Sequence, residues 1–266
     1  MKNVLQNILY VEDEPDIQRI VKLALELVAG MRVINCSSGM EAIARAHEIS
    51  IDLILLDVMM PQMDGPTTLS RLREIPSLKD TPVVFMTAKA HPGEVAHFKS
   101  LGARDVIAKP FDPMKLADTL RDIWGRIDTA PIATVAAQGE TGAVQIENAA
   151  EKRFAERMAA LTEQFRRELP SRLMTLQQQW QVLDAEWNIA ERNLDALRGL
   201  HSSTHNLAGA GATFGYDELT TRARAIDRHF KIALEQKQLP DAAARIEIGT
   251  LFAALESELQ RVIAEL

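Results

Sequence analysis

The spacing of apolar residues changes near residue 127, and the two halves of the chain predict different folds. In the first half, short apolar runs alternate with segments whose apolar residues recur every three or four positions. The runs are predicted strands, at 7–11, 31–36, 52–56, 82–86 and 105–108. The periodic segments are predicted helices, at 17–28, 40–47, from Pro66 onward, 91–101 and 112–125. Runs without strict alternation are typical of parallel strands buried on both faces, which indicates an open, doubly wound α/β domain with a five-stranded parallel sheet.

Apolar residues in the second half form five helical stripes and show no strand pattern. The stripes extend over 154–165, 173–187, 194–207, 219–230 and 248–262. Most gaps within a stripe are three or four residues, which places each set on one face of a helix. Because such faces must be buried against one another, the pattern predicts a bundle of helices.

The segment 127–146 separates the two patterns and is rich in Ala, Thr and Gly. It has no large apolar periodicity, so it is predicted to be a flexible linker, and about 20 such residues have a mean reach of about 25 Å. The predicted domains are therefore residues 1–126 and residues 147–266.

Composition narrows the functions that the chain could have. The formal net charge is −7 and no basic cluster stands out, which argues against binding to nucleic acid. Cys36 is the only cysteine, which excludes an intrachain disulfide and fits a reducing compartment. No apolar run approaches the roughly 20 residues of a membrane span, and no signal-peptide core is present. We therefore expect a cytoplasmic protein without membrane insertion.

Polar residues follow the predicted strands of the first half. Glu12 and Asp13 come after the first strand, Asp57 after the third, Thr87 after the fourth and Lys109 after the fifth. Ligands of open α/β sheets bind at the carboxyl ends of the strands, so these side chains should meet there. Three close carboxylates repel one another unless a cation compensates, and oxygen ligands suit Mg²⁺. The combination favours phosphoryl transfer to an aspartate, whereas no Gly-rich phosphate loop indicates a nucleotide site.

The motifs VEDEPDI, LILLDVMMPQMDG, VVFMTAKA and DVIAKPF resemble, in order and spacing, those of response-regulator receiver domains. The resemblance covers residues 1 to about 125 and implies a flavodoxin-like sheet of strand order 2-1-3-4-5. It implies that Asp57 is the phosphoacceptor. It also implies that Asp13, Asp57 and the main-chain carbonyl of Met59 hold Mg²⁺, with Glu12 supporting the ion through water.

The same resemblance assigns roles near the fifth strand. Thr87 and Lys109 are expected to contact the phosphoryl oxygens, and the bond between Lys109 and Pro110 is expected to be cis. The position three residues before the lysine is often aromatic in this family, and here it is Val106.

The segment HNLAGAGATFG, residues 205–215, places glycines in a predicted helix, where each costs about 1 kcal/mol relative to alanine. On a helix, His205 lies about 200° from Leu207 and about 140° from Leu200, so we expect its imidazole to face water. Ala208 and Ala212 are expected on the same side. Small residues there would admit a close approach, either by the active site of a partner or by a neighbouring helix. His201 lies nearer the apolar face and is expected to be structural or a neighbour of the site.

This segment resembles the signature of histidine-containing phosphotransfer (Hpt) domains, which are four-helix bundles with a surface histidine that accepts and donates a phosphoryl group. The resemblance covers about 147–266 and implies that His205 is the phosphorylated residue. The family frequently has lysine three residues after the histidine, and here that residue is Ala208.

Together these observations predict a two-component signalling protein without an ATP site. A sensor histidine kinase or another phosphorelay protein would donate a phosphoryl group to Asp57, and His205 would carry one in a phosphorelay. The alternative is a binding module controlled by phosphorylation, or a phosphatase, in which His205 is not phosphorylated. A transcription factor is disfavoured because the second half has no basic recognition helix. The sequence does not indicate an oligomeric state.

Overall fold

The computed structural model describes residues 4–47, 50–88, 91–128, 143–185, 190–236 and 238–265. The chain divides into two compact units, Met1–Ala160 and Leu161–Leu266, and each has its own hydrophobic core.

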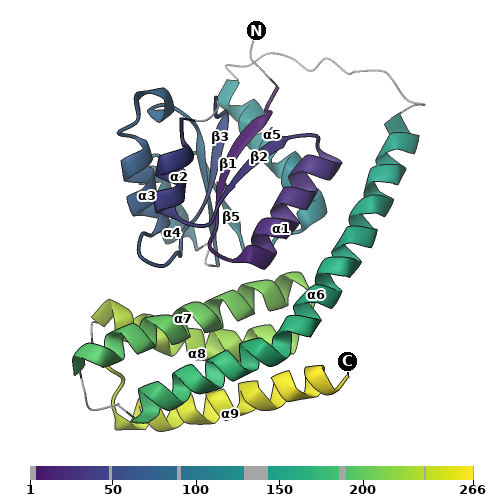
Figure 1. Cartoon of the computed structure of the whole chain (residues 1–266). Coiled ribbons are helices and arrows are strands. Elements are labelled where there is room, and N and C mark those ends of the chain that lie inside the picture. Colours follow the sequence, from purple (N-terminus) through teal and green to yellow (C-terminus); the bar gives the residue numbers. More distant parts are fainter. Residues whose placement is uncertain are drawn as a thin grey trace. The chain divides into compact units, whose positions relative to one another are not determined.

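The first unit contains a parallel sheet with strand order β2-β1-β3-β4-β5 (Figure 1). The strands are β1 (Asn7–Val11), β2 (Arg32–Cys36), β3 (Leu53–Asp57), β4 (Val83–Thr87) and β5 (Asp105–Ala108). Each boundary lies within one residue of its predicted position. Every residue of β3 and β4 is buried, which explains why these strands show no alternation of apolar and polar residues. The doubly wound α/β prediction is confirmed.

Helices cover both faces of this sheet, with α1 and α5 on one face and α2, α3 and α4 on the other (Figure 1). Their bounds are α1 (Pro15–Leu23), α2 (Gly39–Arg45), α3 (Gly65–Leu72), α4 (Pro92–Ser100) and α5 (Pro113–Asp128). A π-helical segment, Ala24–Val28, continues α1, and a short 3₁₀ turn, Pro76–Leu78, follows α3.

The second unit is formed by helices packed around an apolar core, as the stripes predicted. Its helices are α6 (Ala143–Ala185), α7 (Ala190–Thr213), α8 (Asp217–Gln236) and α9 (Ala242–Ala264); α6 begins before the unit boundary. Phe165, Phe230 and Phe252 are among its largest fully buried side chains. None of the helices described here has the length and apolarity needed to cross a membrane.

The first two predicted stripes belong to one helix, because α6 continues through Pro170. Proline removes a backbone donor and usually ends or kinks a helix, so the sequence pattern broke there while the helix did not. Trp187, the last residue of the second stripe, lies outside the described residues.

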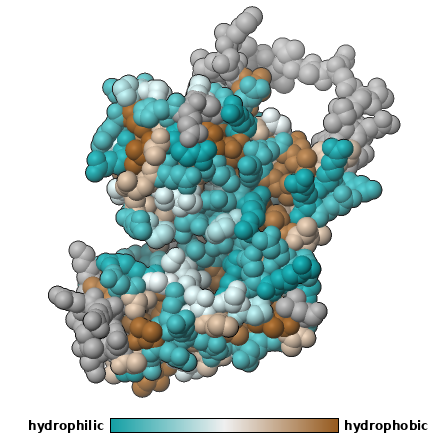
Figure 2. All heavy atoms as spheres, viewed as in Figure 1, coloured by the Kyte–Doolittle hydropathy of each residue, from teal (hydrophilic) through white to brown (hydrophobic). Residues whose placement is uncertain are grey.

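The predicted linker at 127–146 overlaps both flanking helices, since α5 ends at Asp128 and α6 begins at Ala143. The rest of that segment, 129–142, lies outside the described residues, so its flexibility stays a prediction. On the face shown in Figure 2, hydrophilic residues cover most of each unit and hydrophobic residues form small, separate patches.

Candidate functional site

The carboxyl edge of the sheet brings three acidic side chains together. Glu12 and Asp13 follow β1, and Asp57 is the last residue of β3. One carboxylate oxygen of each residue lies within 4.8 Å of the others. Glu12 and Asp57 are almost fully buried, with 1% and 2% of their surface exposed. The strand ends thus gather the charges that the sequence predicted to meet.

Lys109 lies against two of these acids. Its Nζ is 2.6 Å from Glu12 Oε2 and 2.8 Å from Asp57 Oδ1, and all three side chains are buried. The backbone N–H of Lys109 donates to the carbonyl of Thr87 at 2.7 Å, which ties the end of β5 to the end of β4. The bond between Lys109 and Pro110 is cis, as expected. Thr87 itself is buried at this edge.

Burial and mutual repulsion set the protonation of this site. Burial raises the pKa of Glu12 to about 7; the charge of Asp57 adds to the shift, and Lys109 opposes it. Burial alone would lower the pKa of Lys109, but the charges of Asp57 and Glu12 outweigh it and hold that pKa above its ordinary value. The lysine is therefore a permanent cation beside Asp57.

Tyr10 is a member of this site that the sequence did not reveal. Its hydroxyl donates to Glu12 Oε2 at 3.0 Å from a fully buried position in β1. Burial, and then the charge of Glu12, raise the pKa of Tyr10, so the hydroxyl stays protonated and remains a donor. In the sequence, Tyr10 is one aromatic residue within the apolar run that predicts the strand 7–11.

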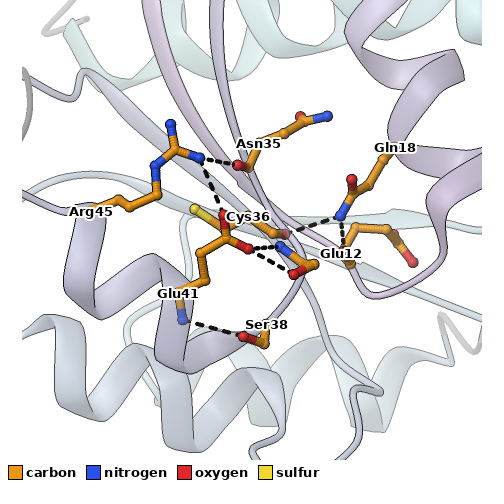
Figure 3. Close-up of polar contacts among 8 residues, drawn as sticks. Glu12, Gln18, Asn35, Cys36, Ser38, Glu41 and Arg45 are labelled. Atoms are coloured by element: carbon orange, nitrogen blue, oxygen red, sulfur yellow. Dashed lines mark hydrogen bonds and ion pairs between the residues drawn. The ribbon is translucent and has the colours of Figure 1, made fainter.

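Gln18 of α1 connects the loop that carries Glu12 to the end of β2 by hydrogen bonds. Gln18 Nε2 donates to the carbonyl of Glu12 and, at 3.2 Å, to the carbonyl of Cys36 at the end of β2 (Figure 3). The N–H of Glu12 also donates to that Cys36 carbonyl, at 3.0 Å. Beyond Cys36, the N–H and the hydroxyl of Ser37 both donate to Glu41 Oε2 at 2.7 Å. These bonds connect the acidic loop to the first turn of α2.

The site fits a divalent cation with oxygen ligands. Asp57 uses Oδ1 to bind Lys109, whereas Oδ2 is buried and has no hydrogen-bond partner among the described residues. A buried carboxylate oxygen in that situation is costly unless a cation or a donor completes it. Met59 lies in the loop two residues after Asp57, and its carbonyl stays a predicted ligand.

The start of α3 packs directly on the backbone of Asp57. A Cβ atom built on Gly65 would overlap the carbonyl oxygen of Asp57 and approach Val58 Cα to 3.0 Å. The N–H of Gly65 donates to the carbonyl of Val58 at 3.0 Å. Glycine at this position therefore lets α3 begin against the end of β3.

A second group of polar residues lies in the helical unit, around His205 of α7. His205 Nδ1 is 3.5 Å from Asp227 Oδ2 on α8, and only 19% of the histidine side chain is exposed. The prediction of an imidazole facing water was therefore wrong for most of the ring. The angular position of His205 on its own helix contains no information about α8, whose Asp227 covers one edge of the ring.

His201, one turn before His205, contacts the same carboxylate. Its Nε2 is 3.3 Å from Asp227 Oδ1, and the two imidazole rings stack with centroids 6.0 Å apart and planes inclined by 21°. Burial lowers the pKa of His201, and the charge of Asp227 offsets part of that shift. The sequence placed His201 near the site, as observed, but gave no signal for Asp227.

Comparison with known families matches each unit separately. The response regulator receiver domain family matches residues 8–121, and the Hpt domain family matches residues 160–265. The chain is a receiver domain joined to an Hpt domain. Receiver and Hpt domains are signalling modules of two-component phosphorelays.

Several curated proteins are similar to part of this chain. The probable transcriptional regulator ycf27 of Porphyra purpurea is 34% identical over 128 residues, which are 48% of this chain and 51% of that protein. RpaA of Synechocystis sp., a DNA-binding dual master transcriptional regulator, is 34% identical over 129 residues, which are 48% of this chain and 53% of RpaA. The signal transduction histidine-protein kinase BarA of Shigella flexneri is 33% identical over 113 residues, which are 42% of this chain and 12% of BarA. This chain spans about half the length of the first two proteins.

Among solved structures, the chemotaxis protein CheY4 of Vibrio cholerae is 32% identical. The match covers 45% of this chain and 99% of CheY4, with a TM-score of 0.43.

In the Hpt domain, the small residues near His205 have different neighbours. A Cβ atom built on Gly211 would lie 2.9 Å from Thr220 Oγ1, so this glycine admits the neighbouring helix α8. Ala208, expected on the solvent side with His205, is instead buried in the bundle core. The position at which the Hpt resemblance implies a lysine is thus occupied by a core alanine.

In the receiver domain, Val106 is half-buried and packs against the core on the α2–α4 face of the sheet. The aromatic ring that the receiver family often has at this position is thus replaced by a small aliphatic side chain.

Proposed function

We propose that Asp57 accepts a phosphoryl group from a phosphohistidine and that His205 carries one, so that the chain acts within a phosphorelay. The main support is the environment of Asp57, which has one oxygen on Lys109 and the other buried without a hydrogen bond among the described residues. That arrangement leaves one nucleophilic oxygen beside a fixed positive charge.

In the receiver domain, Asp57 Oδ2 attacks the phosphorus of a phosphohistidine. A P–O bond forms, the P–N bond of the donor breaks, and the imidazole leaves with the electron pair. Lys109 stabilises the charge on the phosphoryl oxygens, and Thr87 is the hydroxyl donor at the same edge.

Asp13, Asp57 and the carbonyl of Met59 would hold Mg²⁺, with Glu12 acting through water. When bound, the cation supplies charge neutralisation for the phosphoryl oxygens.

In the Hpt domain, the contact with Asp227 favours the tautomer of His205 that carries its proton on Nδ1. Nε2 then keeps its lone pair and attacks the phosphorus of a phosphoaspartate on a receiver domain. A P–N bond forms, the P–O bond breaks, and the aspartate leaves as a carboxylate. The carboxylate of Asp227 stabilises the positive charge that develops on the ring, as an orienting acid does for a catalytic histidine.

The partners of this chemistry are a sensor histidine kinase or another phosphorelay protein, acting in the cytoplasm. Because acyl phosphates and phosphohistidines differ in stability, the two modified sites can be told apart. Phosphoaspartate is lost in alkali, whereas phosphohistidine survives alkali and is lost in acid.

Phosphate-affinity gels test the proposal. With Mg²⁺ and acetyl phosphate, the wild type should shift with an alkali-labile phosphate, and Asp57→Ala should not, while Asp80→Ala, at an exposed position, behaves as wild type. With a phosphorylated receiver as donor, the Asp57→Ala protein should gain an alkali-stable phosphate. A further His205→Gln change should abolish it, and His97→Gln, at an exposed position, should not.

Two results would contradict the proposal. Full labelling of Asp57→Ala by acetyl phosphate would exclude Asp57 as the acceptor. Equal alkali-stable labelling with and without His205, or none in either, would favour the alternative in which the helical domain is a binding module or a phosphatase.

A further inference from the structure

Asp227 lies between two imidazoles and offers a different oxygen to each. Oδ2 is 3.5 Å from Nδ1 of His205, and Oδ1 is 3.3 Å from Nε2 of His201. The two rings occupy successive turns of α7 and stack with centroids 6.0 Å apart, while the carboxylate comes from α8. One acid therefore links the proposed phosphoacceptor to a second histidine.

Neither contact is a tight hydrogen bond. An N–H···O bond has a donor–acceptor distance near 2.9 Å, and both separations here are longer. In the described part of the chain, His201 Nε2 and Asp227 Oδ1 are both buried without a well-aligned partner. The two atoms lie 3.3 Å apart, so a hydrogen bond between them would satisfy both.

We propose that His201 is a positioning residue for phosphotransfer, acting through Asp227. By donating from Nε2 to Asp227 Oδ1, His201 fixes the plane of the carboxylate so that Oδ2 faces His205 Nδ1. The inference rests on the proposed role of His205. It adds a second imidazole, which touches no phosphoryl group, as a determinant of how well the first imidazole is oriented.

The charges around His201 suit a neutral donor. Burial lowers the pKa of His201; the negative charge of Asp227 raises it, and the positive charge of Lys231 and any charge on the His205 ring lower it. A neutral His201 can donate one N–H to Asp227 without neutralising its charge. The carboxylate thereby keeps its negative charge for His205.

In the part of the chain that the structure describes, the acids of the receiver domain form the only group of three such side chains whose ligand atoms lie within 4.8 Å of one another. The two histidines and Asp227 do not meet that condition.

Two substitutions distinguish the hydrogen-bond donor of His201 from the volume of its side chain. His201→Gln keeps an amide N–H at a similar reach, and His201→Leu has a similar volume without any donor. The readout is the rate at which the full-length Asp57→Ala protein takes a phosphoryl group from a phosphorylated receiver. We expect the leucine variant to be slower by about tenfold, and the glutamine variant to stay within about twofold of its parent, as for residues that orient a reactive imidazole.

Coupling to Asp227 distinguishes positioning from a general structural role. In an Asp227→Asn background, His201→Leu should cause no further loss, because the residue through which it acts has already been changed. The ¹⁵N shifts of the His205 ring report the same effect without any phosphorylation. They should indicate a proton on Nδ1 in the wild type and a mixture of tautomers in His201→Leu.

The outcomes separate this inference from the proposed function. If the parent accepts phosphate and His201→Leu accepts it equally fast, the inference is wrong. It is also wrong if the rate losses from His201→Leu and Asp227→Asn add in the double variant. If the parent accepts none, the proposed function fails, and an unchanged His205 tautomer in His201→Leu then overturns the inference independently. Thermal melting checks folding, and His201→Met, which also lacks a donor, replaces the leucine variant if that variant does not melt cooperatively.

Discussion

At the scale of single residues, Glu12 receives two donors on one oxygen. Lys109 Nζ and the hydroxyl of Tyr10 both reach Oε2, at 2.6 and 3.0 Å. A carboxylate oxygen of Glu12 also lies within 4.8 Å of one from Asp13 and one from Asp57, where a cation would bind. Tyr10 is thus an orienting group for the acidic site, although it lies within the core of the sheet.

Tyr10→Phe removes that hydroxyl with little change in volume. We expect the affinity for Mg²⁺ to fall about fivefold, because a net hydrogen bond is worth about 1 kcal/mol. Isothermal titration calorimetry measures the dissociation constant, and Tyr216→Phe in the Hpt domain is the matched control. An unchanged affinity in a variant with wild-type melting would show that the hydroxyl does not orient Glu12.

The pH dependence of Mg²⁺ binding follows from the same carboxylate. The pKa of Glu12 is raised to about 7, so below that pH the folded receiver domain holds a proton that a cation must displace. Affinity for Mg²⁺ should therefore rise as the pH increases through about 7 and level off above it. Calorimetric titrations between about pH 6 and pH 8 measure this change.

Glu12→Gln supplies the control for that dependence, since an amide does not titrate in this range. The variant should bind Mg²⁺ with an affinity that varies little over the same interval. A slope equal to that of the wild type would assign the titration to another group.

At the scale of elements, the start of α3 packs closely against the end of β3 at Gly65. Gly65→Ala should destabilise the receiver domain by about 1–3 kcal/mol, because the added methyl overlaps the backbone of Asp57 and the helix must move. Denaturant unfolding measures the loss. Gly93→Ala in α4 is the paired control, since a Cβ there meets nothing within 4 Å and should be neutral or slightly stabilising. Similar effects for both variants would argue against the close contact.

The strands were predictable to within one residue because buried parallel strands consist of short apolar runs, and Asp57 and Thr87 end two of them. The helical unit was less predictable. Pro170 interrupts the apolar spacing of α6 without ending the helix. The pattern of α7 alone could not show that Ala208 is buried or that Asp227 covers His205, because both facts depend on how α8 packs against it.

At the scale of the whole molecule, each unit buries its own core and carries its own candidate site. The site residues of the receiver domain were accessible from sequence because they follow strands, and strand ends converge at one edge. The sequence did not reveal the roles of Tyr10, Gln18 and Asp227. A buried tyrosine, a helix-surface glutamine and one acid among many have no distinguishing spacing. The segment 127–146 was predicted from composition, which cannot locate the ends of the helices on either side.

His205, the proposed phosphoacceptor, and Asp227, which contacts it, belong to different helices, α7 and α8. A transplant of the segment HNLAGAGATFG into another bundle would move His205 and leave Asp227 behind. Anyone who engineers this module has to move two helices together, with their mutual register intact.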